Sequence, residues 1–236
     1  NRFVYASSQS MYGISDSEDE LDEYNSTKNP ITAYARTKWE VEEALKKMAN
    51  PDFNIVCFRP STVFGASPRL RCDIVFNNFV ACAYTTGKIE IMSDGSPWRP
   101  VVHVKDVSNA FIAGLEAPVE IIANQSYNVG IPDGNFTVKE LAKAAQSVVS
   151  GSELRFMGEH VDSRTYKISF SRILNDLKDY YKPKWTLRRG GDELVKLFKK
   201  VNFDESDFRG NKFIRLNQIN DLISKNVINK DLRFNQ

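Results

Sequence analysis

Two short segments near the start of the chain are apolar at consecutive positions, residues 3–6 and residues 55–58. Runs of this kind are typical of parallel strands that are covered on both faces. The segment between them predicts a helix, because one stripe recurs at steps of four and three: Tyr34, Lys38, Val41, Leu45 and Met48. A strand, a helix and a second strand make a βαβ unit. The pattern therefore predicts an α/β fold with a right-handed crossover.

The same pattern gives the details of this helix and of the elements that follow it. Asn29 is suited to cap the helix and Pro30 to its first position, and we expect the apolar stripe to be buried. The strand at residues 3–6 reads as an interior strand whose neighbour on one side is not encoded here; an edge strand is the alternative. Further elements are expected as helices near residues 72–86, 105–116, 137–149, 187–200 and 214–223, and as strands near 89–92, 100–104 and 126–129.

Composition excludes several classes of function. The chain has 236 residues, with 32 basic against 30 acidic side chains, so net charge gives no reason to expect nucleic-acid or membrane binding. No apolar run is long enough to span a bilayer, and two histidines are too few for a histidine-based metal site. Cys57, Cys72 and Cys82 form no C-x-x-C pair, so we expect buried thiols and a cytoplasmic protein. The acidic segment at residues 16–23 is expected to be a solvated face.

Two neighbouring features carry candidate chemistry. Tyr34 and Lys38 lie four residues apart on one face of the predicted helix, and a lysine on an apolar face needs a partner. The alternative is that Lys38 reaches solvent along its stem and that Tyr34 is an ordinary core aromatic. Residues 6–13 follow the first strand and contain three serines; carboxyl ends of parallel strands are where α/β proteins bind ligands, although a plain turn would also suit them.

In combination, these features resemble extended short-chain dehydrogenases, the nucleotide-sugar epimerase/dehydratase family. The resemblance is carried by the strand and serine loop RFVYASSQSMYG at residues 2–13 and by the Tyr-x-x-x-Lys pair Tyr34 and Lys38. FRPSTVFG at residues 58–65 and DGSPWRPVVHVKDV at residues 94–107 resemble later segments of the family, as do DSRTY at 162–166, Ser171 and PKWTL at 183–187. The five motifs are collinear and cover nearly the whole chain.

The resemblance implies a catalytic set of Ser8, Tyr34 and Lys38 and an NAD or NADP cofactor. Tyr34 would accept the proton of a sugar hydroxyl, with its phenolate favoured by Lys38 and by the cationic nicotinamide. Ser8 would hydrogen-bond the same sugar oxygen. Pro60 and Thr62 would help to seat the nicotinamide, beside Tyr34 and Lys38.

The implied substrate is a nucleotide-linked sugar, with its diphosphate bound by Asn78, Arg99 and Arg164. Arginine suits this role because its planar fork meets phosphate oxygens bidentately. The alternatives are that Arg99 and Arg164 are surface ion-pair partners and that Asn78 caps or lines a helix. His103, among valines, is interpreted as a structural histidine. Family members are commonly dimers that use the helix of Tyr34, so the resemblance also implies a homodimer.

Two departures from the family pattern qualify the expected activity. The glycine-rich turn that would bind the cofactor pyrophosphate is absent, which predicts that roughly 100 residues of an upstream segment are missing and that this chain alone is inactive. Gln9 and Ser10 stand where the sugar dehydratases of the family carry Asp-Glu, and neither can do acid/base work at neutral pH. This favours an epimerase. A keto-sugar reductase, a nucleotide-sugar decarboxylase and a non-catalytic binding module stay open.

The expected fold is the C-terminal part of a Rossmann-like doubly wound parallel sheet with a smaller α/β substrate-binding domain. Residues 1–65 would form part of the catalytic core, joined by a returning strand near 125–130. Residues 66–236 would be mainly substrate-binding and interleaved with that core.

Overall fold

The computed structural model describes residues 1–14, 19–157 and 165–235, which group into two compact units. The first unit comprises residues 1–64, 92–140 and 158–186, and the second comprises residues 65–91, 141–157 and 187–236. Each unit is therefore built from three separate stretches of the chain. Arg164, like the rest of residues 158–164, lies outside the described residues.

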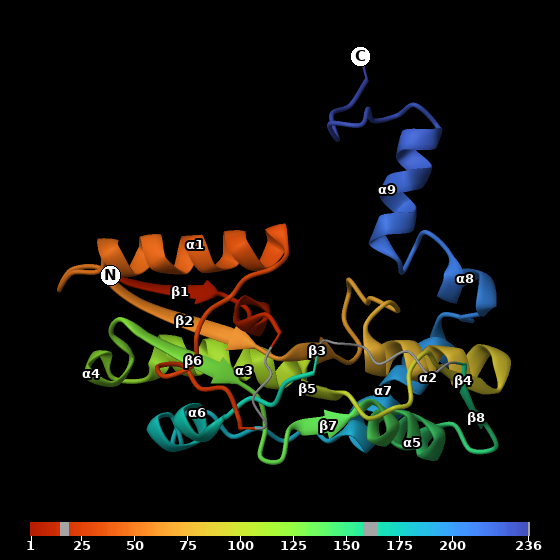
Figure 1. Cartoon of the computed structure of the whole chain (residues 1–236), viewed down its shortest axis with the longest axis horizontal. Helices are drawn as coiled ribbons and strands as arrows, with labels where there is room; N and C mark the ends of the chain where they lie inside the picture. The colour runs from red at the N-terminus through yellow and green to blue at the C-terminus, as the bar shows by residue number, and fades with distance from the viewer. Residues whose placement is uncertain (15–18, 158–164, 236) are drawn as a thin grey trace. The chain divides into compact units, whose positions relative to one another are not determined.

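The first unit is organised around a parallel three-stranded sheet in the order β1–β2–β6 (Figure 1). Its strands are β1 (Arg2–Ala6), β2 (Asn54–Pro60) and β6 (Gln125–Val129). The helix between β1 and β2 is α1 (Ala33–Met48), so the predicted βαβ unit is confirmed. The returning strand expected near residues 125–130 is β6, which pairs in parallel with β2.

The two faces of β2 are covered by different helices. Gly114 on α3 (Val104–Glu116) lies so close to the sheet that an added Cβ would be 2.5 Å from the Phe58 ring. Arg59 is the next residue, and its side chain bonds to Glu42 on α1 instead. Because successive side chains of a strand point to opposite faces, α1 and α3 cover opposite sides of the sheet. Residues 55–59 are accordingly buried throughout.

The strand β1 is less enclosed than its neighbour. Within the described residues it pairs with β2 alone, and none of its five residues is buried. Phe3 is 41% exposed. β1 is thus an edge strand in this structure, and the expectation of a further neighbour from an upstream segment stays a prediction.

A second, smaller sheet completes the first unit. It has the order β3–β5–β7, with β3 (Thr62–Phe64) parallel to β5 (Trp98–His103) and β7 (Asn135–Thr137) antiparallel to β5. Buried His103 stacks on Trp185 at 3.9 Å between ring centroids, and its Nδ1 accepts a hydrogen bond from the Lys105 amide, which caps α3. It is a structural histidine. The unit also contains the short 3₁₀ helix η1 (Gln9–Tyr12) and the helices α4 (Val119–Ile122) and α6 (Ser171–Asp176).

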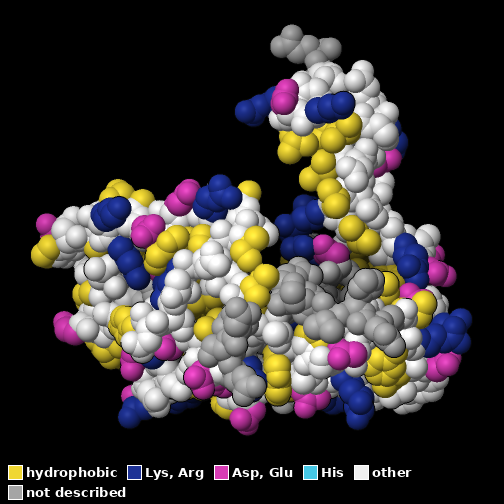
Figure 2. Space-filling model, in the orientation of Figure 1, with side chains coloured by type: hydrophobic (Ala, Val, Ile, Leu, Met, Phe, Trp, Pro, Cys, Tyr) yellow, Lys and Arg dark blue, Asp and Glu magenta, His cyan; other side chains and the backbone are white. Residues whose placement is uncertain are grey.

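The second unit contains the parallel pair β4 (Lys88–Ile91) and β8 (Glu153–Phe156). Aromatic contacts hold its helices together, with Phe198 5.4 Å from Tyr84 and 4.3 Å from Phe203 between centroids. Its helices are α2 (Val75–Thr86), most of α5 (Val138–Val148), α7 (Leu187–Lys200), α8 (Glu205–Arg209) and α9 (Arg215–Ser224). No residue of α9 is buried, and Figure 2 shows hydrophobic side chains along it.

Two expectations about α1 were wrong. The helix begins at Ala33 and is capped by Thr32, whose Oγ1 accepts from the Ala35 amide at 3.1 Å; Asn29 and Pro30 precede it. The stripe that we expected to be buried is largely exposed: Tyr34, Val41 and Met48 are 57%, 42% and 59% exposed, whereas Lys38 and Leu45 are half-buried. The buried residues of α1 are Ala35 and Glu42.

Buried thiols were predicted correctly, since Cys57, Cys72 and Cys82 are all buried and free. No helix in the described ranges combines the length and apolarity that a membrane crossing requires. Among the same residues, no three His, Cys, Asp or Glu side chains form a group that could hold a metal ion.

Candidate functional site

Lys38 is fixed at the carboxyl end of β1. Its Nζ donates a hydrogen bond to the carbonyl oxygen of Ala6, the last residue of the strand, at 2.7 Å. The Tyr5 hydroxyl donates to the Lys38 carbonyl oxygen at 3.4 Å, so both ends of the lysine are tied to β1. The second turn of α1 is therefore anchored to the strand end that precedes the serine loop.

Tyr34 lies one turn before Lys38 on the same helix. The Lys38 ammonium is 5.9 Å from the centroid of the Tyr34 ring and 5.2 Å from that of Tyr5. Tyr34 is 57% exposed, so its side chain is accessible to a ligand. The sequence predicted that Lys38 needs a polar partner, and this partner is the Ala6 carbonyl oxygen.

Ser8 begins the turn that follows β1. Its Oγ accepts from the Ser10 amide at 3.2 Å and lies 2.9 Å from the Ser10 hydroxyl oxygen. Two bonds hold this loop against β2: the Ser7 amide donates to the Phe58 carbonyl at 2.7 Å, and Gln9 Nε2 donates to the Arg59 carbonyl at 3.0 Å. The half-buried Ser8 therefore sits beside the last residues of β2.

The structure brings Pro60 and Thr62 to the same region. Pro60 is the last residue of β2 and Thr62 the first of β3, and both are half-buried. Between them, Ser61 donates from its amide and its hydroxyl to the Val129 carbonyl, each at 3.0 Å. Because β1 and β2 are parallel, Ser8, Lys38 and Pro60 lie at one edge of the sheet.

The three predicted diphosphate contacts are placed differently. Arg99 lies in β5 of the first unit, two residues before Val101, the partner of Thr62, and its Nη1 donates to the Trp98 carbonyl at 2.8 Å. Asn78 belongs to α2 of the second unit, where its Nδ2 donates to the Cys72 carbonyl at 3.0 Å. That bond agrees with the alternative of a helix-lining side chain. Arg164 lies outside the described residues.

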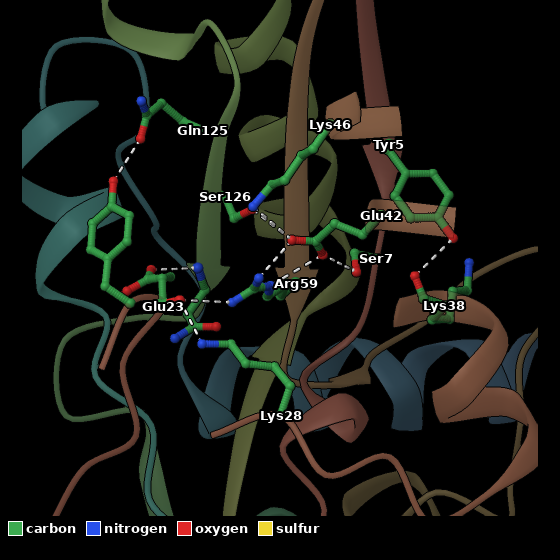
Figure 3. Close-up of polar contacts among 12 residues, drawn as sticks. Tyr5, Ser7, Glu23, Lys28, Lys38, Glu42, Lys46, Arg59, Gln125 and Ser126 are labelled. Carbon is green, nitrogen blue, oxygen red and sulfur yellow. Dashed lines mark hydrogen bonds and ion pairs between the residues drawn. The ribbon is translucent and has the colours of Figure 1, made fainter. Parts of the chain in front are cut away.

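Beneath these residues lies a buried ion pair that sequence reasoning missed (Figure 3). Glu42 and Arg59 are 0% and 1% exposed, and Arg59 meets the Glu42 carboxylate with Nη2 at 2.6 Å and Nε at 3.2 Å. Burial opposes ionisation of Glu42, but the hydrogen bonds and charge of Arg59, with the hydroxyls of Ser126 and Ser7, lower its pKa to about 2. The available signal was Arg59 itself, a charge inside an otherwise apolar strand.

The acidic segment at residues 16–23 is not wholly a solvated face. Glu23 is 5% exposed, and its Oε1 accepts from the Asn128 amide at 2.7 Å, because this residue folds back onto the end of β6. Burial raises the pKa of its carboxyl group. Asp19 and Glu20 are exposed as expected, while residues 15–18 are outside the description.

Comparison with known proteins extends this picture. The model of the NAD dependent epimerase/dehydratase family matches residues 1–130, more than half of the chain. The chain belongs to this family. The matched residues include the serine loop, α1, β2 and Arg99. The residues at the carboxyl ends of β1 and β2 therefore all lie within the part of the chain that matches the family.

The following relatives are distant from this chain in sequence. UDP-glucose 4-epimerase of Bacillus subtilis is 25% identical over 211 residues, which cover 82% of this chain and 60% of the relative. The structure of UDP-glucose 4-epimerase from Thermotoga maritima with UDP-glucose superposes with a TM-score of 0.72 at 22% identity, over 85% of this chain and 64% of that one. A dTDP-glucose 4,6-dehydratase from Bacillus anthracis in complex with NAD gives 0.67 at 20% identity, over 84% and 61%.

The chain thus spans about 60% of the length of the curated relatives that it matches. The described residues fit the reactive end of NAD: an exposed phenol and a fixed ammonium stand at the carboxyl edge of a parallel sheet. The sequence holds no Gly-x-x-Gly-x-x-Gly turn for the pyrophosphate end.

Proposed function

We propose that the intact protein containing these residues is an NAD(P)-dependent nucleotide-sugar epimerase that acts through a keto-sugar intermediate. The observation that carries the proposal is the 2.7 Å bond from Lys38 to the end of β1, which sets the Tyr-x-x-x-Lys helix beside the Ser8 loop. A hydride leaves a sugar carbinol only if the hydroxyl proton also leaves. The site therefore needs a base and an oxygen-binding group at one place, and Tyr34 and Ser8 supply them.

Each residue has a defined role in this proposal. Tyr34 accepts the proton of the sugar hydroxyl, and Lys38 stabilises the resulting phenolate by charge attraction. Ser8 donates a hydrogen bond to the same sugar oxygen, which orients it and stabilises the ketone. When bound, NAD supplies the hydride acceptor and donor. Pro60 and Thr62 would hold its nicotinamide end.

The proposed substrate is a nucleoside diphosphate sugar, and UDP-hexoses are the first to test because two of the three relatives above are named for UDP-glucose. Arg99 is the proposed diphosphate contact in the first unit; Asn78 and Arg164 are proposed on the family resemblance alone. Epimerisation is favoured over dehydration because Gln9 has no carboxyl group that could act as an acid. Its side chain is buried, and its amide donates to the Arg59 carbonyl.

We also propose that the intact protein is a homodimer. The exposed side chains Val41 and Met48 on α1 offer an apolar contact surface. Figure 2 shows hydrophobic side chains among charged ones over this part of the molecule. Apolar side chains at 42% and 59% exposure on one stripe of a helix favour an association that covers them.

The proposal is tested by product analysis on the intact protein with UDP-glucose and NAD, followed by NMR. We expect a second hexose epimer at equilibrium, with no net reduction of NAD and no CO₂. Net NADH oxidation with a keto-sugar would indicate a reductase, and CO₂ release from a uronic acid a decarboxylase. Absence of turnover with every nucleotide sugar tested would overturn the proposal.

The assignment of the base is tested by Tyr34→Phe. We expect kcat to fall by about 10²–10⁴-fold, with the dissociation constant of the nucleotide sugar nearly unchanged, because one hydroxyl is lost and little contact area. Tyr180→Phe is the matched control, since Tyr180 is a partly exposed tyrosine outside the site. If Tyr34→Phe retains more than a few per cent of the wild-type rate, the base is another group.

A further inference from the structure

The Glu42 carboxylate accepts hydrogen bonds from β2, from β6 and from the residue that directly follows β1 (Figure 3). Its Oε2 accepts from the Ser7 hydroxyl at 2.6 Å, at the end of β1, and from Arg59 Nε on β2. Its Oε1 accepts from the Ser126 hydroxyl on β6 at 2.6 Å and from Arg59 Nη2, with Lys46 Nζ 3.3 Å away. One side chain of α1 is thus bonded to β2, to β6 and to the start of the loop that follows β1.

Arg59 is held as completely as its partner. Its Nη1 donates to the Tyr12 hydroxyl at 2.9 Å and lies 3.5 Å from the Glu23 carbonyl, while Nε and Nη2 face Glu42. The planar guanidinium admits only one orientation against a carboxylate in this bidentate arrangement. Buried, charge-assisted bonds of this kind fix geometry more tightly than apolar contacts, which tolerate sliding and repacking.

Three residues of this cluster are neighbours of residues of the proposed site. Glu42 is one helical turn after Lys38. Ser7 is the residue before Ser8, and Arg59 is the residue before Pro60. The cluster therefore joins the helix and loops that carry the base, the hydroxyl donor and the nicotinamide contact, although it includes none of these three residues.

We propose that Glu42 and Arg59 are positioning residues for the reaction: they set the rotation and height of α1 against the ends of β1 and β2, so that Tyr34, Ser8 and Pro60 face one substrate. This inference rests on the proposed function. Stability alone does not require a buried ion pair, because apolar residues of similar volume often serve equally well or better. Catalysis is more sensitive than stability to the placement of these elements, since a displacement of about 1 Å between reacting groups costs on the order of 10²-fold in rate.

The decisive variant is Glu42→Leu combined with Arg59→Met, which removes both charges and keeps the volume. In the intact protein we expect a melting temperature within a few degrees of wild type. We expect kcat to fall by about 10–100-fold and KM for the nucleotide sugar to change by less than about twofold. Glu43→Gln, an exposed carboxylate next in sequence on the same helix, is the matched control and leaves both constants unchanged. A stable double variant with wild-type kcat would overturn the inference.

A second readout does not depend on turnover. Hydrogen exchange on the 236-residue chain should be at least about tenfold faster in the double variant for residues 7–12 and the first two turns of α1, with α7 unchanged as an internal reference. If the wild-type protein turns over no nucleotide sugar, the proposed function fails while this measurement still decides the positioning. Unchanged exchange in both segments would overturn it.

Where the double variant does not fold, Ser7→Ala takes its place. It removes only the hydroxyl that ties the Ser8 loop to Glu42, and we expect kcat to fall about threefold or more with KM preserved. Tyr180→Phe again serves as the control. A Ser7→Ala protein with unchanged kcat would contradict the proposed coupling between the cluster and the loop.

Discussion

The two faces of α1 reverse the usual distribution of polar and apolar residues. The face toward the sheet buries Glu42, at 0% exposure, beside the small residue Ala35. A neighbouring face, about a quarter to a third of a turn around the helix, exposes Tyr34, Val41 and Met48. Whether a side chain is buried here depends on the hydrogen bonds available to it as much as on its hydrophobicity. A carboxylate that accepts bonds from Arg59, Ser7 and Ser126 is stable inside, whereas the apolar stripe is free to meet a partner.

The largest effect on the free energy of unfolding is expected when one partner of the buried ion pair is removed. Glu42→Ala leaves the Arg59 guanidinium buried without its counter-charge, so the free energy of unfolding should fall by about 3–5 kcal/mol. Urea denaturation of the chain, followed by circular dichroism, measures this. Glu43→Ala on the exposed side is the control and should change the free energy by about 0.5 kcal/mol or less. A loss below about 1 kcal/mol for Glu42→Ala would mean that water or rearrangement compensates the arginine.

Lowering the pH should weaken the Glu42–Arg59 pair in the unmodified chain and so reduce its free energy of unfolding. The pKa of Glu42 is about 2 in the folded state, against 4.5 for an ordinary glutamate. A depressed folded-state pKa contributes stability that is fully present above pH 4.5 and is lost as the pH falls toward 2. The two values correspond to about 3 kcal/mol, as an order of magnitude.

Glu42→Gln separates this contribution from those of other carboxyl groups. Denaturation between pH 6 and pH 2 should show a shallower decline in the free energy of unfolding for the variant than for wild type. Parallel pH profiles for the two proteins would show that Glu42 is not ionised and paired as described.

Sequence reasoning found the elements of the fold more readily than their orientation. The βαβ unit, α2, α3, α5, α7 and α9 follow from local periodicity, which needs no knowledge of distant residues. The inward face of α1 does not, because the partners of Glu42 lie 17 residues away at Arg59 and 84 residues away at Ser126. The short elements α4, β7 and β8 carry too few residues for a periodic signal.

The candidate site divides in the same way. Ser8, Tyr34, Lys38 and Pro60 were predicted from motif and strand order, and parallel pairing does bring them to one edge. Their roles stay predictions. The bond from Lys38 to the Ala6 carbonyl could not be predicted, because a lysine pattern does not specify which backbone oxygen it will reach.

The smallest effect on stability is expected on the exposed face. Val41→Ser and Met48→Ser together should change the free energy of unfolding by no more than about 0.5–1 kcal/mol, because side chains at 42% and 59% exposure lose little burial. The effect on association should be far larger if α1 is a contact between copies. Light scattering on the 236-residue chain is expected to show self-association that the double serine variant reduces. Leu115→Ser and Ile112→Ser on α3, exposed by 57% and 48%, test whether any loss of apolar surface has this result. If the chain is monomeric at high concentration, the exposed stripe of α1 is not a contact between copies. The exposure of Val41 and Met48 would then be explained by the burial of Glu42 on the sheet-facing side of the helix.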